Sequence, residues 1–290
     1  MTILMTGSHG FVGSNLIEAL GSTYHIIRWN AREDKPLPEC DAVIHLAGLA
    51  HDTKNVIETK RYFDVNTELT QKIFDRFSVS SARKFIFFSS IKAQDGDTAY
   101  AKSKKAAENY ILSHTDITDG TERQTKKVYI LRPCMIHGKG NKGNLNLLVK
   151  WVKKGLPWPL AAFENKRIFA SMDNVSFIVN ELIKRDAPSG TYNICDDEAV
   201  STNKLIELIC ECMGKKTHLW RIPKGLMKGL ARVGDVLHLP LNTERMEKLT
   251  ENYIVSNQEI KLALGVNRML VDAKEGLRQS IMSMINEDKQ

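Results

Sequence analysis

The first fifteen residues constrain the fold more than any other stretch of this 290-residue chain. An apolar run, Ile3-Leu4-Met5, leads directly into Gly7, Gly10 and Gly13, and a helical pattern of apolar residues follows. A strand, a glycine turn and a helix in this order place helix amides where they can face a pyrophosphate. Any glycine-rich loop can be a plain turn, but the neighbours of this one favour a dinucleotide site.

Each glycine has a separate role in such a turn. Gly7 would allow the chain to reverse, and Gly10 would let the backbone approach the phosphates without a Cβ in the way. Gly13 would let the helix pack closely on the strand.

Composition limits the class of protein. With 42% hydrophobic and 26% charged residues, the chain can form one large domain or two modest ones. No stretch is long enough to cross a bilayer and no secretory signal precedes the first strand, so we expect a cytoplasmic protein without stable membrane insertion. The cysteines form no paired framework, and we expect neither a disulfide nor a metal site from Cys40, Cys134, Cys195, Cys210 and Cys212.

The formal net charge of +7 is spread along the chain, and no nucleic-acid-binding signature accompanies it. We therefore expect no nucleic-acid partner. Anionic small molecules, such as a dinucleotide and a phosphorylated substrate, suit this charge, and so does a merely solvated basic surface.

Strand-like and helix-like runs alternate through the first half. The apolar runs are 3–5, 25–27, 42–46, 85–88, 128–131 and 191–194. This alternation predicts an α/β fold with a doubly wound, Rossmann-type parallel sheet. Residues 1–139 form the expected dinucleotide-binding domain, to which 168–200 return, and 140–290 form a smaller, mainly helical substrate lobe. Its expected helices are 145–154, 174–184, 202–213, 223–237, 256–264 and 272–285.

A second stretch carries candidate chemistry. The run Phe85–Phe88 ends in Ser89 and Ser90, and Tyr100 and Lys104 follow one helical turn apart. The ammonium would lower the pKa of the phenol for proton transfer, while Ser90 hydrogen-bonds the same substrate oxygen. Either pattern alone is common on surfaces, but both after a glycine turn favour hydride transfer at a carbonyl or alcohol.

These residues resemble the extended short-chain dehydrogenase/reductase superfamily, in its NAD-dependent epimerase/dehydratase branch, which acts largely on nucleotide sugars. The resemblance covers nearly the whole chain and rests on Thr6–Gly13, Asp41–Gly48, Asp64–Thr67, the trio Ser90, Tyr100 and Lys104, and Leu131–Pro133 with His137-Gly138. It implies that Lys104 also binds the nicotinamide ribose and that Asp41 lies near the adenine. The expected cofactor contacts are Gly7, Gly10, Phe11, Val12, Gly13, Arg28, Arg32, Asp41, Leu46, Ala47, Gly48, Asn66, Tyr100, Lys104 and Pro133.

The end of the second strand bears on which dinucleotide is bound. NAD enzymes place a carboxylate there for the ribose hydroxyls, but this chain has Arg28 and Arg32 and no carboxylate before Glu33. Arginines can pair with a 2′-phosphate, so NADP(H) is favoured over NAD(H), although surface arginines are common after strands.

Finer matches indicate a substrate class. The stretches Lys142–Leu145, Gly155–Leu160 and Asn165–Arg167 are similar to a subgroup that reduces or epimerises C4 of UDP-N-acetylhexosamines in surface-polysaccharide biosynthesis. The resemblance implies that Asn144 and Leu145 contact the nucleotide diphosphate, that Arg167 binds a phosphate and that Ser90 contacts the sugar. A plain surface charge is the alternative for Arg167.

Departures from the family are informative. Dehydratases carry an Asp-Glu pair directly after the catalytic hydroxyl residue, where this chain has Ile91-Lys92, so we expect no dehydration. The loop from Ser90 to Tyr100 is short, and we expect the strand between 30 and 41 to be lost or rudimentary.

The sequence therefore predicts an NAD(P)-dependent reductase of a 4-keto group on a UDP-linked deoxy or acetamido sugar. A UDP-hexose or UDP-N-acetylhexosamine 4-epimerase with bound NAD is the alternative enzyme, and a dinucleotide-sensing protein without catalysis is an alternative of another class. A homodimer could form through Phe63, Phe74 and the helix 100–114. The stripe Leu226, Met227, Leu230, Val233 and Leu237 is expected to face the core, with a membrane surface as the alternative.

Overall fold

The computed structural model describes residues 1–33, 35–50, 58–115, 126–141, 143–237 and 242–287. The chain forms two compact units. The first comprises Met1–Cys134, Asn174–Ile194 and Asn257–Arg268, and the second comprises Met135–Asp173, Cys195–Ser256 and Met269–Gln290. Residues 257–268 thus belong to the first unit, whereas the sequence prediction assigned them to the substrate lobe.

The first unit contains a six-stranded parallel sheet in the order β2-β1-β3-β4-β5-β8. The strands are β1 (Thr2–Thr6), β2 (His25–Trp29), β3 (Ala42–His45), β4 (Lys84–Phe88), β5 (Lys127–Pro133) and β8 (Gly190–Ile194). In the described residues between β2 and β3 there is no further strand, as predicted. Strand order reverses beside β1, and ligands of such sheets bind at the carboxyl edge of that switch point.

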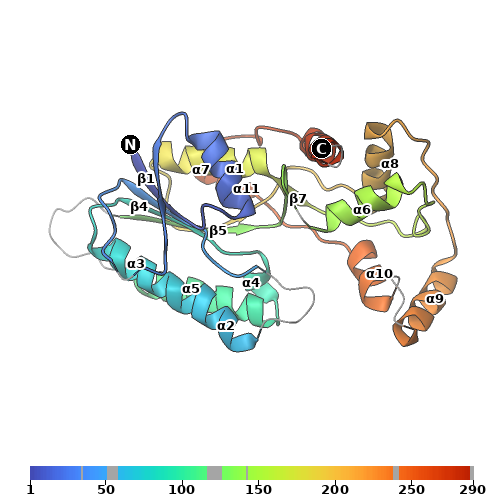
Figure 1. Cartoon of the computed structure of the whole chain (residues 1–290), viewed down its shortest axis with the longest axis horizontal. Coiled ribbons are helices and arrows are strands. Elements are labelled where there is room, and N and C mark those ends of the chain that lie inside the picture. The colour runs from blue at the N-terminus through green and yellow to red at the C-terminus, as the bar shows by residue number, and fades with distance from the viewer. Residues whose placement is uncertain (34, 51–57, 116–125, 142, 238–241, 288–290) are drawn as a thin grey trace. The chain divides into compact units, whose positions relative to one another are not determined.

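Helices cover both faces of this sheet, which confirms the predicted doubly wound fold (Figure 1). On one face lie α1 (Phe11–Leu20), α7 (Met172–Lys184) and α11 (Gln258–Leu264); on the other lie α2 (Thr59–Phe63), α3 (Leu69–Val79) and α5 (Ala99–Ser113). A short helix, α4 (Lys92–Asp95), follows β4. The helices α2 and α3 are joined by one π-helical turn, η1 (Asp64–Glu68).

Aromatic packing between the sheet and α3 forms much of this unit's core. The Phe85 ring lies 5.2 Å from the Phe74 ring and 5.1 Å from the Phe77 ring, and all three side chains are buried. Phe74 is therefore a core residue and unavailable for the dimer contact suggested for it, while Phe63 is half-buried.

The second unit is mainly helical around one short parallel strand pair, β6 (Met135–His137) and β7 (Phe169–Ser171). Its helices are α6 (Asn144–Lys153), α8 (Thr202–Cys212), α9 (Lys224–Val236), α10 (Thr243–Thr250) and α12 (Ala273–Glu287). Buried Leu148, Ile209 and Leu277 belong to a shared core of α6, α8 and α12. Among the described residues, no helix is both long enough and apolar enough to span a bilayer.

Candidate active site

The glycine turn after β1 packs tightly on the chain that follows β3. Gly7 has a φ of +67°, and a Cβ there would lie 2.6 Å from the Ala47 nitrogen. A Cβ on Gly13 would lie 2.4 Å from the Gly7 oxygen, so Gly13 permits close packing of α1 on the turn itself, not on the strand as predicted. Only glycine satisfies both positions.

The first turn of α1 offers free backbone donors. Gly10 is the N-cap residue, no side chain caps the helix, and the first turn contains no carboxylate. The amides of Phe11, Val12 and Gly13 have no acceptor in the described chain. Amides at a helix N-terminus bind anions such as a pyrophosphate, so this turn fits the predicted dinucleotide.

A buried hydrogen-bond network fixes the chain after β3. Thr6 Oγ1 accepts hydrogen bonds from the amides of Leu46 and Ala47, each 3.2 Å long, and donates to His45 Nδ1 at 2.7 Å. Thr70 Oγ1 donates its one proton to the Asn66 oxygen, so it accepts from His45 Nε2 at 3.0 Å, which leaves His45 Nδ1 as the acceptor for Thr6. Burial, and secondarily the Lys104 charge, lowers the pKa of His45 to about 3, so this imidazole is neutral and its tautomer is set by the network.

Asn66 connects this segment to α5. Its Oδ1 accepts from the Leu49 amide at 2.7 Å, and its Nδ2 donates to the Leu49 oxygen and to Ser103 Oγ. A Cβ on Gly48 would lie 2.9 Å from Asn66 Oδ1 and 3.2 Å from Lys104 Nζ. Asn66 lies in the π-helical turn, a kind of local geometry that is frequent at functional sites.

The predicted catalytic trio comes together in the first unit. Ser90 follows β4, while Tyr100 and Lys104 lie one turn apart on α5. The Tyr100 hydroxyl shares a hydrogen bond with Ser90. One oxygen of a substrate could therefore contact both hydroxyl groups.

The groups that shift the pKa of Tyr100 differ from the one predicted from the sequence. Burial raises the pKa of the phenol, the hydrogen bond with Ser90 lowers it, and the neighbouring Tyr62 raises it slightly. Lys104 does not lower it as predicted, because the Lys104 ammonium points to the end of β4 and donates to the Phe88 oxygen at 2.9 Å.

Lys104 is a buried cation with unused hydrogen-bonding capacity. Its Nζ lies 4.9 Å from the centre of the Phe87 ring, and burial lowers its pKa to about 8. An ammonium has three donors, and the Phe88 oxygen is its acceptor in the described chain. The remaining donors, beside the bare Cα of Gly48, fit a ligand with hydroxyl groups such as a ribose.

A buried carboxylate beneath the trio was not predicted from the sequence. Glu108, which is fully buried, accepts from Ser89 Oγ at 2.6 Å and from Arg132 Nε at 2.8 Å and NH2 at 2.5 Å. The signal was available, because Glu108 lies four residues after Lys104 on the same helical face. Ser89 directly precedes Ser90, so the hydrogen bond between Ser89 and Glu108 holds in place the segment that carries the Ser90 hydroxyl.

The other predicted cofactor residues do not all lie at the same edge of the sheet. Pro133 ends β5 near Ser90, and its oxygen accepts from the Ile91 amide at 3.2 Å. Arg28 and Arg32 are exposed at and after the end of β2. Asp41 lies at the opposite, amino edge of the sheet, where it accepts from the Thr2 amide at 2.6 Å. The expectation that Asp41 lies near the adenine is therefore wrong, because cofactors of this fold bind beyond the carboxyl edge.

The predicted substrate residues lie in the second unit. Asn144 is the first residue of α6. The Leu145 side chain is buried in the core, so only its backbone at the start of α6 could meet a ligand. The Arg167 guanidinium donates to the Lys248 oxygen, and burial lowers the pKa of Arg167. Arg167 is thus a half-buried, hydrogen-bonded cation, not a plain surface charge.

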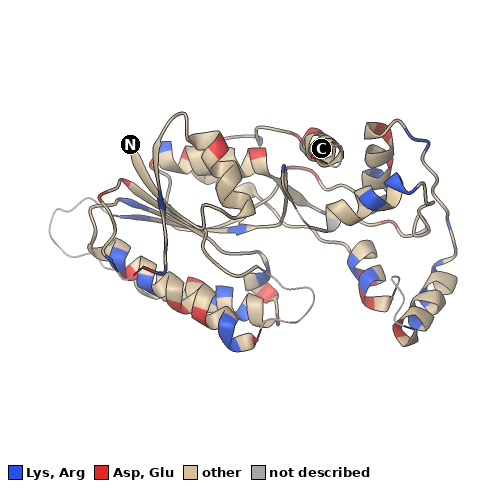
Figure 2. Ribbon diagram, viewed as in Figure 1, with Lys and Arg blue, Asp and Glu red and all other residues tan. Residues whose placement is uncertain are grey.

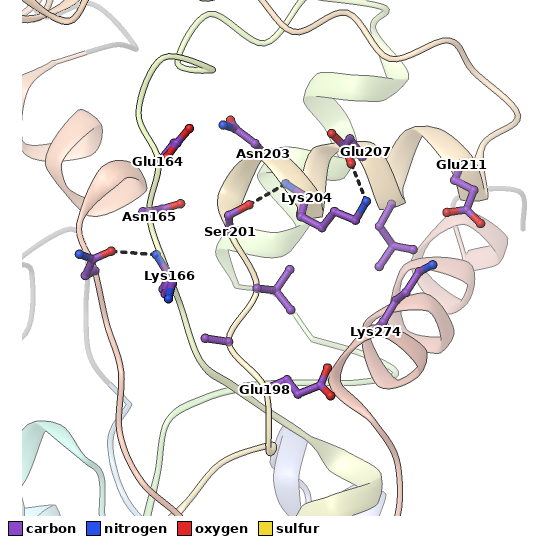
Figure 3. A pocket seen from close by; sticks show the side chains of 14 residues that line it. Glu164, Asn165, Lys166, Glu198, Ser201, Asn203, Lys204, Glu207, Glu211 and Lys274 are labelled. Atoms are coloured by element: carbon purple, nitrogen blue, oxygen red, sulfur yellow. Dashed lines mark hydrogen bonds and ion pairs between the residues drawn. The ribbon is translucent and has the colours of Figure 1, made fainter.

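The second unit also contains a polar hollow of about 760 Å³ (Figure 3). Among its lining residues are Glu164, Lys166, Glu198, Lys204 and Lys274, and the Lys204 ammonium donates to Glu207 at 2.8 Å. Its walls mix carboxylates with ammonium groups, and none of the predicted catalytic, cofactor or substrate residues lines it.

The chain is similar to several known proteins. A model described as the NAD dependent epimerase/dehydratase family matches residues 3–195. A UDP-glucose 4-epimerase of Vibrio cholerae is 29% identical over 258 residues, covering 77% of this chain and 78% of the relative. An N-acetyl-α-D-glucosaminyl-diphospho-ditrans,octacis-undecaprenol 4-epimerase of Escherichia coli O157:H7 is 26% identical over 254 residues, covering 76% and 75%.

A solved structure shares the whole fold. The UDP-glucuronic acid 4-epimerase of Bacillus cereus in complex with NAD superposes with a TM-score of 0.72 and 16% identity, covering 99% of both chains. At that identity the likeness establishes the fold, which is the one predicted from the strand pattern.

Proposed function

Because the chain belongs to the NAD dependent epimerase/dehydratase family, we propose that it is an enzyme that transfers hydride at C4 of a UDP-linked sugar. The observation that carries the proposal is the Ser90–Tyr100 hydrogen bond, with Lys104 buried behind it. A dinucleotide-sensing protein without catalysis would have no use for this arrangement.

The residues divide the chemistry between them. The nicotinamide, when bound, supplies or accepts the hydride. The Tyr100 hydroxyl donates its proton to the sugar oxygen, and Ser90 hydrogen-bonds that oxygen and holds it in place. The Lys104 ammonium would hold the ribose hydroxyls, and the free amides of α1 would hold the pyrophosphate.

The preferred direction is reduction of a 4-keto group on a UDP-linked deoxy or acetamido sugar. Exposed Arg28 and Arg32 at the end of β2 support this choice, because guanidinium groups suit the 2′-phosphate of NADPH, which reductases consume. Ile91-Lys92 supplies no acid–base pair after Ser90, so the proposal excludes dehydration.

The second candidate is a UDP-hexose or UDP-N-acetylhexosamine 4-epimerase with tightly held NAD. The names of the Vibrio cholerae and Bacillus cereus relatives support it. An epimerase uses the same trio, but it must oxidise and then re-reduce one bound substrate, so its cofactor is regenerated in each turnover.

On the substrate side, the backbone at the start of α6, at Asn144 and Leu145, is proposed to bind the diphosphate of the nucleotide together with Arg167. For Arg167 this role requires that its guanidinium keep donors free beyond the one used by the Lys248 oxygen, and an arginine has five.

One assay separates the candidates. Purified protein is mixed with NADPH or with NADH, UDP-4-keto-6-deoxy-N-acetylglucosamine is added, and absorbance of the reduced nicotinamide is followed. Loss of absorbance with NADPH supports the reductase. Without such loss, conversion of UDP-N-acetylglucosamine to its C4 epimer with no added cofactor supports the epimerase. NADPH binding with neither conversion would leave the sensor as the better account.

A further inference from the structure

Helix α9 exposes an apolar stripe. Its buried face consists of Met227, Ala231 and Gly234. Leu226, Leu230 and Val233 are 58%, 49% and 51% exposed. The expectation that this stripe faces the core is therefore wrong for all but Met227, and leaving large apolar side chains in water costs free energy unless something covers them.

The same segment concentrates positive charge. Residues 214–237 contain one carboxylate, Asp235, and six cations, which are Lys215, Lys216, Arg221, Lys224, Lys228 and Arg232. Thr243 donates to both oxygens of Asp235. Figure 2 shows basic residues recurring along the connection from α8 to α9 and on α9 itself. Much of the chain's net charge of +7 thus lies in this short stretch.

An exposed aromatic residue precedes the helix. Trp220 is 56% exposed and lies between the cations at 216 and 221. Tryptophan is favoured where an apolar phase meets water, as at the headgroup level of a bilayer. Nucleic-acid surfaces attract cations but give no reason to expose leucine and valine at helical spacing.

We propose that the segment 218–237 docks on an anionic lipid bilayer, with Leu226, Leu230 and Val233 entering the headgroup boundary. By helical spacing, the cations of α9 lie on the side turned away from the exposed leucines, and the Lys224 ammonium lies 5.7 Å from the centre of the Phe163 ring. A helix is only about 10 Å wide, so the long side chains of Lys228 and Arg232 still lie within roughly a Debye length of lipid phosphates that Leu226 and Leu230 reach. Apolar insertion and electrostatic attraction then act together, and the described part of the chain has no helix able to span the bilayer.

The carboxylates near α9 leave this attraction intact. On α10, which packs against α9, Glu244 is paired with Lys248, and the second carboxylate, Glu247, is balanced in charge by Arg245. Asp235 is held by Thr243 at the end of α9 remote from Trp220. The docking surface therefore keeps a net positive charge.

The test is sedimentation of the full chain with vesicles of phosphatidylcholine mixed with phosphatidylglycerol, against vesicles of phosphatidylcholine alone. We expect binding to the anionic vesicles, weakened by salt. Leu226→Gln with Leu230→Gln, and separately Lys228→Gln with Arg232→Gln, should each lower the partition coefficient by about tenfold or more. The control pair Ile254→Gln with Leu262→Gln alters exposed apolar residues outside this segment and should leave binding unchanged.

The outcomes are decisive because every changed side chain is exposed, so thermal unfolding should be the same in all variants. Equal binding by the α9 variants and the wild type would overturn the proposal. So would absence of vesicle binding together with a dimer that the leucine variants dissociate in analytical ultracentrifugation, which would assign the stripe to a second copy of the chain. Neither outcome bears on the C4 chemistry, which is assayed separately with a soluble substrate.

Discussion

Tyr100 and Ser90 share a hydrogen bond although they lie on different elements, Tyr100 in the first turn of α5 and Ser90 after β4. Burial raises the pKa of Tyr100, so the phenol remains protonated at neutral pH and is ready to donate. The bond also identifies the point where a substrate oxygen would lie, between two hydroxyl groups.

Replacing Tyr100 with phenylalanine removes this proton donor and little else. We expect kcat to fall by about a factor of 10³, while NADPH affinity, measured by fluorescence titration, stays within about threefold because the Lys104 and α1 donors are unchanged. Tyr62→Phe is the matched control, since its ring meets the Tyr100 ring edge-on and only the Tyr62 hydroxyl is lost. Substantial turnover by Tyr100→Phe would contradict the proposed role.

We expect the buried ammonium of Lys104 to lower the free energy of unfolding. Its pKa in the folded state is about 8, below the ordinary value of 10.5, so between these values the unfolded chain binds the proton that the folded chain has lost. The free energy of unfolding therefore rises with pH between these two values, and the destabilisation by the Lys104 charge is complete below pH 8. Lys104→Met should unfold at a higher urea concentration than wild type at pH 7, and the difference should shrink as the pH approaches 10. A difference that grows with pH would contradict the burial argument.

Glu108 should matter more for stability than any exposed ion pair. Glu108→Ala would leave Arg132 without its carboxylate and Ser89 without its acceptor, and we expect the free energy of unfolding to fall by about 3–5 kcal/mol. Glu108→Gln keeps an acceptor for Ser89 and should lose less. Lys105 lies 3.7 Å from the same carboxylate but is 43% exposed, so Lys105→Ala should cost about 1 kcal/mol or less. Denaturant titration of the three variants tests this order.

Cofactor choice can be measured at the end of β2. Arg28→Ala with Arg32→Ala should raise the KM for NADPH by about tenfold or more, because each guanidinium is worth a charge-assisted hydrogen bond to a 2′-phosphate. The KM for NADH should change little, since NADH lacks that phosphate. Arg83→Ala is the control, because Arg83 is an exposed arginine just before β4, at the amino edge of the sheet. Equal effects on both cofactors would remove the argument for NADPH.

Local patterns were sufficient for the sheet and for the positions of the trio's residues, whose catalytic role stays a prediction. The six apolar runs became the six strands, because buried parallel strands need continuous apolar residues. Ser90, Tyr100 and Lys104 lie at the position where strand order and helical spacing put them. The helix α10 escaped prediction because Met246 is its one buried residue, so its sequence has no apolar period.

Tertiary context explains two of the errors. The error at Asp41 has a different source, because Asp41 directly precedes the predicted strand 42–46 and so had to lie at the amino edge of a parallel sheet; the family resemblance was followed instead. The ammonium of Lys104 is directed by the Phe88 oxygen, which spacing on α5 does not reveal. The stripe on α9 has the period of a buried face, yet Met227 faces inward while Leu226 does not, because period alone does not say which side another element covers.

Substitutions at Gly7 and Gly214 separate the effect of backbone strain from the effect of a steric clash. Gly7 and Gly214 have nearly the same left-handed φ, +67° and +63°, but a Cβ on Gly7 would lie 2.6 Å from the Ala47 nitrogen, whereas one on Gly214 meets nothing within 4 Å. Gly214→Ala should therefore cost only the conformational penalty, about 1–2 kcal/mol in the free energy of unfolding. Gly7→Ala should cost at least about 2 kcal/mol more, because the chain after β3 must move. That movement displaces the backbone beside Gly48 and Lys104, so NADPH affinity should fall in Gly7→Ala and remain unchanged in Gly214→Ala. Equal losses of stability in the two variants, measured by urea denaturation, would show that the turn is not packed against Ala47 in this way.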